Sequence, residues 1–263
     1  MVLLSHRMRR IAAIMFVAGL GYAQSFRFAI VGDRTGEAQP GVYEQVWREV
    51  DRYHPSFAVN VGDTIQGGDD ATAAQEWESV RKVWTTYSYK LFFTPGNHDI
   101  WSAASEKIYE KFTGHPPMYS FDWQQAHFTI LDNSRTENLS EPQMKFLAED
   151  LERNRDRNPK FVFFHRPTVW LIPLKFQSDF PLHDLVRRYH VAAVVSGHTH
   201  QYTRIEKEGV VYLSVGSSGG HLRGTGFKEG WFFQWAQAEV RGGKVDLRVK
   251  ELGPPLGEGR VVE

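Results

Sequence analysis

The chain has 263 residues, of which 41% are hydrophobic and 14% aromatic, so it can bury a substantial core, and one domain is the default expectation. Its 31 basic residues are balanced by 31 acidic ones, which argues against a strongly basic surface for nucleic acid, and we expect no specific nucleic-acid binding. There is no cysteine, so disulfides are excluded and any metal must be bound by nitrogen and oxygen atoms.

Residues 1–24 have the layout of a secretory signal peptide. Arg7, Arg9 and Arg10 precede a short apolar run at residues 11–20, and a small-residue cleavage site follows at 21–23. The run falls short of the ~20 apolar residues that a membrane span needs. We therefore expect export to the periplasm or the medium, with no stable membrane span after cleavage.

After this segment, short runs rich in Val, Ile and Phe predict strands, and longer amphipathic runs predict helices. In the first half, strands are expected at residues 26–31, 57–61, 91–94, 118–123 and 127–131, the last two as a hairpin, and helices at 42–53, 71–87 and 105–112. In the second half, helices are expected at 140–155 and 180–189, and strands at 161–164, 191–195, 201–206, 210–215, 231–240 and 244–249. The first of these helices should begin with a capping box of Ser140 and Gln143, with Pro142 in its first turn.

This order of elements predicts an α/β fold in which a central two-sheet β-sandwich of mixed strands is flanked by helices. No repeat, low-complexity tract or Pro/Ser-rich linker divides the chain, so residues 25–252 are expected to form one domain. Residues 253–263 are rich in Gly and Pro and are expected to form a flexible tail.

Five predicted strands end in side chains that can bind metals. These side chains are Asp33, Asp63, Asn97 with His98 and Asp99, His165, and His198 with His200. Each could instead cap a helix, but ligands in open α/β sheets bind beyond the carboxyl ends of the strands, so the seven residues other than Asp99, in register, favour one polar site. Six of these side chains offer oxygen or nitrogen ligands: Asp33, Asp63, Asn97, His165, His198 and His200. Six ligands are too many for one tetrahedral ion and suit a pair of ions ~3.5–4 Å apart.

In their order and spacing, these motifs resemble those of the calcineurin-like metallophosphoesterase superfamily. The residues that carry the resemblance are Gly32-Asp33, Gly62-Asp63, Gly96-Asn97-His98-Asp99, His165 and Gly197-His198-Thr199-His200. The superfamily includes purple acid phosphatases, of which this chain would represent the catalytic domain alone, and many phosphodiesterases. The resemblance covers residues 26–249 and implies the four-layer fold of that family.

The resemblance also implies a role for each residue. Asp63 would bridge two metal ions, Asp33 and His200 would complete the first site, and Asn97, His165 and His198 would complete the second. His98 would donate a proton to the leaving group, oriented by Asp99. The ions would be divalent or mixed-valence, such as Mn, Fe, Zn or Ni. The implied reaction is hydrolysis of a small phosphomonoester or phosphodiester by attack of a metal-bound hydroxide.

The first motif departs from the family pattern. It reads Asp33-Arg34-Thr35, whereas the family usually has a histidine at the third position. Purple acid phosphatases lack that histidine and have a tyrosine three residues after the bridging aspartate, where this chain has Gln66. Water, or an oxygen of Gln66 or Thr35, would then complete the first site, and Arg34 could lie beside the phosphate as a cation. A non-catalytic, metal-stabilised binding module of the same fold is the alternative.

Other polar residues were expected to be structural or peripheral. His127 is expected at the core or a sheet edge, and His183 and His190 in solvent. Asn133 is expected in a turn, although it could approach the site. His221 and Trp101 are candidates for the rim of the site. The oligomeric state, the metal and the natural substrate are left open by the sequence.

Overall fold

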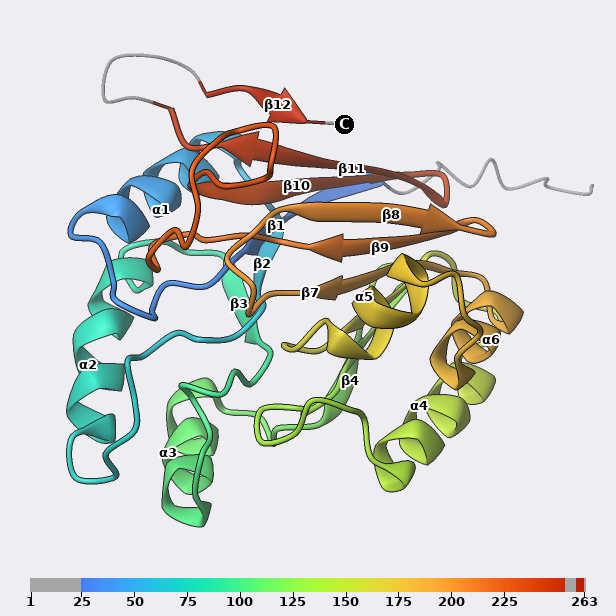
Figure 1. The fold of residues 1–263 in the computed structure, drawn as a ribbon, viewed down its shortest axis with the longest axis horizontal. Helices are drawn as coiled ribbons and strands as arrows, with labels where there is room; N and C mark the ends of the chain where they lie inside the picture. Colours follow the sequence, from blue (N-terminus) through green and yellow to red (C-terminus); the bar gives the residue numbers. More distant parts are fainter. Residues whose placement is uncertain (1–24, 254–258, 263) are drawn as a thin grey trace, which may run out of the picture.

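The computed structural model describes residues 25–253 and 259–262, and the predicted signal peptide lies outside them. Two six-stranded mixed sheets face each other between two layers of helices (Figure 1). In the first sheet, in spatial order, lie β12 (Val261–Val262), β11 (Lys244–Glu251), β10 (Gln234–Arg241), β1 (Ser25–Val31), β2 (Phe57–Asn60) and β3 (Lys90–Phe93). In the second lie β4 (Tyr119–Trp123), β5 (Ala126–Ile130), β6 (Lys160–Phe163), β7 (Val191–Ser196), β9 (Val210–Ser214) and β8 (Thr203–Lys207). The predicted α/β sandwich is confirmed.

Side chains of the central strands alternate between two apolar layers. On β1, Phe28 and Ile30 point into the core between the two sheets, whereas Ala29 and Val31 pack against the helices. On β6, Phe161 belongs to the core between the sheets, and the next residue, Val162, belongs to the core between the second sheet and its helices. Both faces of these strands are buried, which explains why they read as continuous apolar runs.

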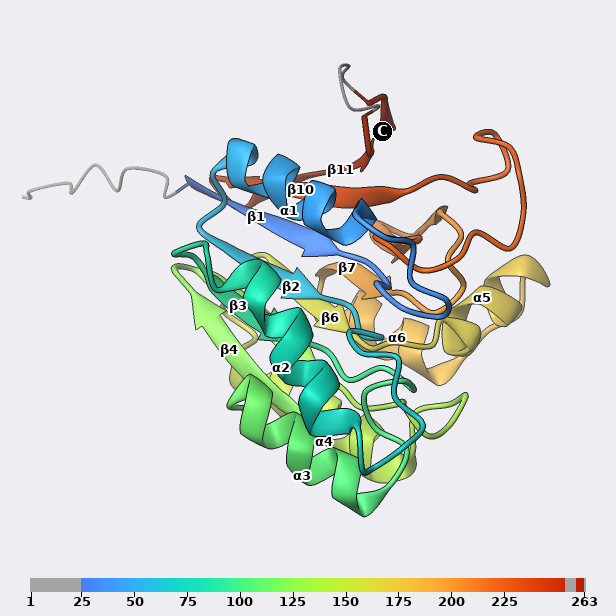
Figure 2. The same ribbon diagram turned by 90° about the vertical axis from the view of Figure 1, so that its left-hand side faces the viewer.

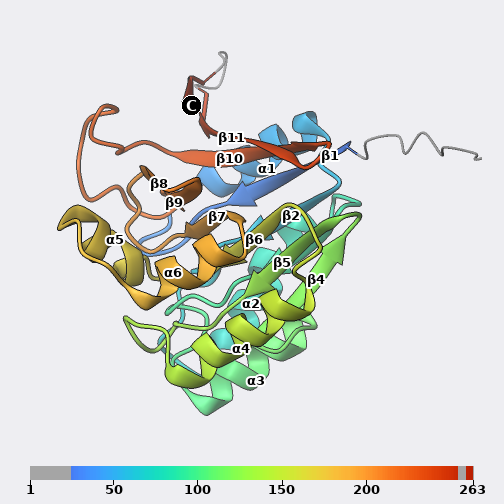
Figure 3. The same cartoon turned by 90° about the vertical axis from the view of Figure 1, so that its right-hand side faces the viewer.

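Three helices cover each outer face of the sandwich. The first sheet is covered by α1 (Val42–Tyr53), α2 (Ala73–Trp84) and α3 (Ala103–Thr113) (Figure 2). The second sheet is covered by α4 (Glu141–Arg153), α5 (Thr168–Lys175) and α6 (Pro181–Arg188) (Figure 3). Fully buried tryptophans join the helices to the sheets, Trp47 and Trp77 on one side and Trp170 on the other. No helix within the described residues is long and apolar enough to cross a membrane.

Strand direction brings the loops that matter to one edge. β1, β2 and β3 run parallel to one another, as do β5, β6, β7 and β9. The carboxyl ends of parallel strands lie at the same edge of a sheet, so the loops that follow them gather there.

Helix α5 is not among the helices expected from the sequence. Pro173 lies inside this helix, and the helix is apolar on nearly every side. Ile172 and Phe176 are exposed by 51% and 71%. The two usual signals of a surface helix, an amphipathic stripe and an interior free of proline, are therefore missing.

The predicted capping box at the start of α4 is wrong. Pro142 lies in the first turn as expected, but the Ser140 side chain makes no capping hydrogen bond. The Gln143 side chain instead donates to the backbone carbonyl of Asp132. A capping box does form at the start of α3, between Ser102 and Ser105.

Two other details differ from the sequence reading. His183 is buried, with Nδ1 2.8 Å from the hydroxyl of Tyr212, so the expectation of a solvated side chain is wrong, whereas His190 is exposed as expected. In the C-terminal tail, β12 pairs with β11, and Arg260 forms an ion pair with Glu251.

His127 on β5 is buried between two carboxylates, as a core histidine. Its Nδ1 lies 2.7 Å from Asp122 and its Nε2 lies 2.8 Å from Asp150, which also accepts a hydrogen bond from Thr129. Burial opposes both charges, but the contacts between the ring and the carboxylates raise the pKa of His127 and lower the pKa of Asp150. The two carboxylates therefore favour the charged form of the ring.

We expect this network to make the stability of the protein depend on pH. The contribution of His127 is complete below its unfolded pKa of ~6.5 and is lost as pH rises through the higher folded pKa. The contribution of Asp150 is present above ~3.9 and is lost as pH falls through its lower folded pKa. His127→Gln should therefore lower the free energy of unfolding most between about pH 4 and 6.5, by roughly 3 kcal/mol.

Urea unfolding at pH 5 and pH 9 checks this expectation. The difference between wild type and His127→Gln should shrink at the higher pH. His190→Gln, at an exposed position, is the matched control and should change stability little at either pH. A difference for His127→Gln that is the same at both values would show that folding does not raise the pKa of the His127 ring.

Candidate metal centre

Loops at the carboxyl ends of five strands bring the predicted ligands together. Asp33 follows β1, Asp63 follows β2, Asn97 follows β3, His165 follows β6, and His198 and His200 follow β7. Their ligand atoms form two groups, in each of which all atoms lie within 4.8 Å of one another: Asp63 with His165 and His198, and Asp33 with Asp63 and His200. Asp63 belongs to both groups, the position that a bridging ligand would occupy.

Three atoms of the predicted ligands are buried without hydrogen-bond partners. Buried side-chain atoms are normally hydrogen-bonded. In the described structure, Asp33 Oδ2, Asn97 Oδ1 and His165 Nε2 are buried and have no hydrogen-bond partner. His165 Nε2 lies 3.2 Å from Asp63 Oδ2, close enough for both atoms to bind one ion. Anionic oxygen, amide oxygen and imidazole nitrogen suit hard and borderline divalent metals, so these residues fit the implied ions.

Backbone groups fix how the ligands point. His165 Nδ1 lies 2.8 Å from the carbonyl of Val61, and His200 Nδ1 lies 2.6 Å from the carbonyl of His221. A carbonyl can only accept, so Nδ1 carries the proton, which leaves the Nε2 lone pair of a neutral ring free to bind a metal. Asp33 is held by a hydrogen bond of 2.8 Å from the backbone amide of His198.

The charges in this cluster are strongly coupled. Burial opposes a charged ring at His165, but the carboxylates of Asp63 and Asp33 raise its pKa to about 9. Burial, together with the nearby His165 and Arg166, lowers the pKa of His198 to about 3, so this ring is neutral and can donate a lone pair. Burial raises the pKa of Asp33.

Glycines leave room for the ligands. A Cβ at Gly96 would lie 2.1 Å from the Asp63 backbone nitrogen, and one at Gly197 would lie 2.6 Å from Asp33 Oδ2. Asp63 and His198 adopt left-handed backbone conformations, with φ of 55° and 70°. Strained backbone of this kind tends to collect at functional sites, where the surrounding structure holds it in place.

His98 lies beside the cluster, and the structure corrects the role of Asp99. His98 Nδ1 is 2.5 Å from the carbonyl of Gln66, so that carbonyl, rather than Asp99, orients the ring. The Asp99 carboxylate is buried and accepts backbone hydrogen bonds of 2.8 Å from Thr64 and 2.9 Å from Gly96. Asp99 therefore joins the loops after β2 and β3 and acts on His98 only through the backbone.

At the first motif, two side chains bind each other. Thr35 Oγ1, which is buried, donates a hydrogen bond of 2.5 Å to Gln66 Oε1. These are the two positions at which related enzymes carry a histidine or a tyrosine ligand. Arg34 donates to the carbonyl of Thr64 at 3.2 Å and lies over the ring of Tyr43 on α1. Its side chain thus contacts α1 and the loop after β2, while its backbone N–H donates to the carbonyl of Asp63 at 3.1 Å.

The sequence reading missed Arg166, which directly follows His165. Its Nη1 lies 3.4 Å from His198 Nε2. Asn133, expected in a turn, is buried, and its side-chain amide forms hydrogen bonds with both the N–H and the carbonyl of the Arg166 backbone. The sequence offered one clue to Arg166, its position one residue after the predicted ligand His165.

The two candidates for the rim of the site lie in different surroundings. Trp101 packs at the edge of the core under α1, α2 and α3, and the His221 side chain is exposed.

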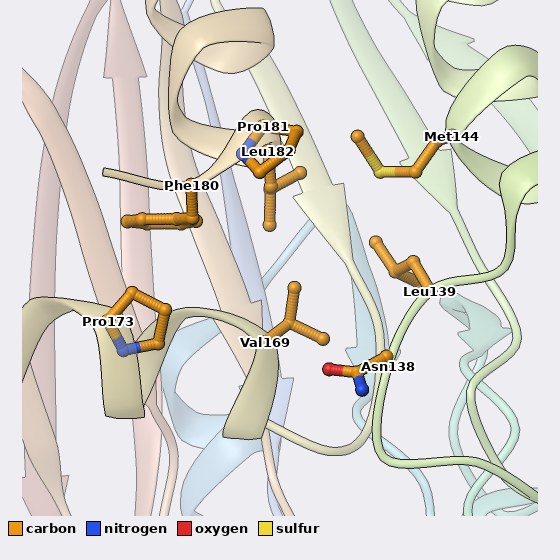
Figure 4. A pocket seen from close by; sticks show the side chains of 8 residues that line it. All are labelled: Asn138, Leu139, Met144, Val169, Pro173, Phe180, Pro181 and Leu182. Carbon is orange, nitrogen blue, oxygen red and sulfur yellow. The ribbon is translucent and has the colours of Figure 1, made fainter. Parts of the chain in front are cut away.

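A separate apolar cavity of about 260 Å³ lies between α4, α5 and α6 (Figure 4). Its walls include Leu139, Val169, Phe180 and Leu182. None of the predicted metal ligands lines it, so it is distinct from the metal centre.

Solved structures share this fold at low sequence identity. A purple acid phosphatase from yellow lupin (Lupinus luteus) seeds is 14% identical, with a TM-score of 0.67 over 91% of this chain, which spans only 54% of the lupin chain. GAP50, described as the anchor in the inner membrane complex of Plasmodium, is 16% identical, with a TM-score of 0.64 over 90% of this chain and 88% of its own. A putative 5'-nucleotidase from Staphylococcus aureus is 12% identical, with a TM-score of 0.57 over 91% of this chain and 54% of its own.

Sequence comparison gives the family directly. A search of curated proteins finds no match. The model of the calcineurin-like phosphoesterases, by contrast, matches residues 26–202, which include all the predicted ligands and His98. This match covers more than half of the chain and agrees with the fold and the ligand clusters, so the chain belongs to the calcineurin-like phosphoesterase family.

Proposed function

We propose that this chain is an exported, dinuclear metal-dependent phosphoesterase. The observation that carries the proposal is the sharing of Asp63 by two groups of potential ligands. Three predicted ligand atoms that are buried without a hydrogen-bond partner, Asp33 Oδ2, Asn97 Oδ1 and His165 Nε2, support it. The family generally binds divalent metal ions, and the proposal specifies two of them per chain.

The proposed ligands are those predicted from the sequence. Asp33, Asp63 and His200 would hold one ion, and Asp63 with Asn97, His165 and His198 would hold the other. When bound, the ions would supply Lewis acidity toward the phosphoryl oxygens and lower the pKa of water. His98 would hold a proton at Nε2 and donate it to the leaving oxygen, while the Gln66 carbonyl keeps Nδ1 in place.

Hydrolysis of model substrates tests the proposal. The protein lacking residues 1–24 should be loaded in turn with Mn²⁺, Zn²⁺, Fe²⁺ and Ni²⁺ and assayed with p-nitrophenyl phosphate and bis-p-nitrophenyl phosphate. We expect at least one metal to support turnover, and the ratio of the two rates reports monoester or diester preference. Folded, metal-loaded protein that hydrolyses neither substrate with any metal would refute the proposal.

A second candidate is a non-catalytic, metal-stabilised binding module. It is favoured by the hydrogen bond between Thr35 and Gln66, which leaves neither side chain as an evident first-site ligand. The shared fold with GAP50, described as an anchor, is compatible with it. One tightly held ion without hydrolysis would support the module, whereas two ions with hydrolysis would support the enzyme.

A further inference from the structure

The backbone of Arg166 is held rigidly beside the metal centre. Its N–H donates to Asn133 Oδ1 at 3.0 Å, and its carbonyl accepts from Asn133 Nδ2 at 2.9 Å. Asn133 is fully buried in the loop that follows β5. One side-chain amide thus fixes both polar groups of the residue that follows His165, and this determines where the arginine side chain begins.

The guanidinium of Arg166 is positioned in turn by the same loop. Nε donates to the carbonyl of Ser134 at 3.3 Å, and Nη1 forms an ion pair with Glu137. Glu137 also accepts a hydrogen bond of 2.7 Å from Thr168 at the start of α5. Only 18% of the Arg166 side chain is exposed. Within the described residues these bonds use Nε and Nη1, so Nη2 remains available for a ligand.

This arginine lies at an electrostatically unusual place. Its Nη1 is 3.4 Å from Nε2 of His198, a member of the proposed second metal site. Two divalent cations would outweigh the charge of the two carboxylates in the ligand set. A guanidinium fixed beside these ions would therefore repel them, unless a bound anion offsets the positive charge of both. Glu137 offsets part of that charge, but its side chain is 51% exposed to solvent, which screens it.

Phosphate is the anion that this arrangement fits. A guanidinium presents parallel N–H groups that match phosphate oxygens, and such charge-assisted bonds are stronger than neutral ones. Arg34, the cation suggested by the sequence, points to Thr64 and Tyr43 instead. We infer that Arg166 binds a non-bridging oxygen of the substrate phosphate at the second metal site, an inference that rests on the proposed phosphoesterase function.

Calorimetric titration of metal-loaded protein with inorganic phosphate tests this inference without requiring turnover. Arg166→Gln should bind phosphate ~10–100-fold more weakly, and its KM for p-nitrophenyl phosphate should rise by a similar factor. Arg166→Lys should recover part of this affinity, because it restores the charge but not the planar fork. Arg135→Gln is the matched control, because Arg135 is 42% exposed and pairs with Glu106 at 2.7 Å. This substitution should leave phosphate affinity and KM unchanged.

Metal content must be measured in every variant, because Arg166 contacts a predicted ligand. We expect Arg166→Gln to retain the same number of ions as wild type. Unchanged phosphate affinity in that variant, loss of metal from it, or no phosphate binding by wild type would each overturn the inference. Absence of hydrolysis in wild type that still binds phosphate through Arg166 would instead refute the proposed activity and leave the phosphate contact standing.

Discussion

Asp63→Asn should abolish binding of at least one of the two metal ions and reduce phosphoesterase turnover by ~10³-fold or more. Asp63 is the residue shared by both ligand groups, and its carboxylate supplies negative charge to each. An amide keeps the size of the side chain but loses that charge, so several kcal/mol of electrostatic stabilisation would be lost, at ~1.4 kcal/mol per tenfold change in rate. Metal analysis and p-nitrophenyl phosphate turnover measure both effects.

The choice of asparagine keeps the backbone effect small. Asp63 has a φ of 55°, a left-handed conformation that asparagine tolerates better than alanine does. Asp246→Asn is the matched control, because Asp246 is half exposed on β11 and pairs with Arg248. Full metal content and full turnover in Asp63→Asn would remove Asp63 from the bridging position.

His98→Ala should retain metal and lose turnover, by ~10²–10⁴-fold for an ester with a strongly basic leaving group. The ring lies outside the two ligand groups, with Nδ1 held by the Gln66 carbonyl. An alkoxide needs a proton as it leaves, whereas p-nitrophenolate is weakly basic and leaves more easily without one. The loss should therefore be larger for an alkyl phosphate than for p-nitrophenyl phosphate, as steady-state rates with the two esters will show.

His221→Ala is a suitable comparison for this variant. The His221 side chain is exposed, and only its backbone carbonyl contacts His200, so the substitution keeps that contact. We expect near wild-type rates with both esters. Equal losses for the two esters in His98→Ala would argue that His98 positions the substrate and does not donate a proton.

The sequence contains enough information to predict the sandwich and the ligand positions. Strands buried on both faces read as apolar runs, and parallel strands end at one edge, so a polar residue just beyond each run could be placed at a common site. Asp33, Asp63 and His198 were predicted in this way, and the structure brings them together. These predictions depend on strand direction and burial, which leave a strong trace in the order of residues.

Contacts between loops were not predictable in the same way. Asp99 and His98 are adjacent in sequence, yet the Asp99 carboxylate binds backbone amides and not the ring. Gln143 fits a capping box but finds a closer partner in the Asp132 carbonyl. Arg166 depends on Asn133, which is 33 residues away. Such partners are chosen by tertiary packing, and a single sequence does not record which loops meet.

The number of metal ions bound per chain tests the central claim most directly. Metal-free protein lacking residues 1–24 should be titrated calorimetrically with the metal that best supports turnover, with elemental analysis of the loaded protein. The shared position of Asp63 predicts two ions per chain, with hydrolysis in the same preparation. Saturation at one ion, with no hydrolysis of either model ester, would contradict the dinuclear site and support a binding module.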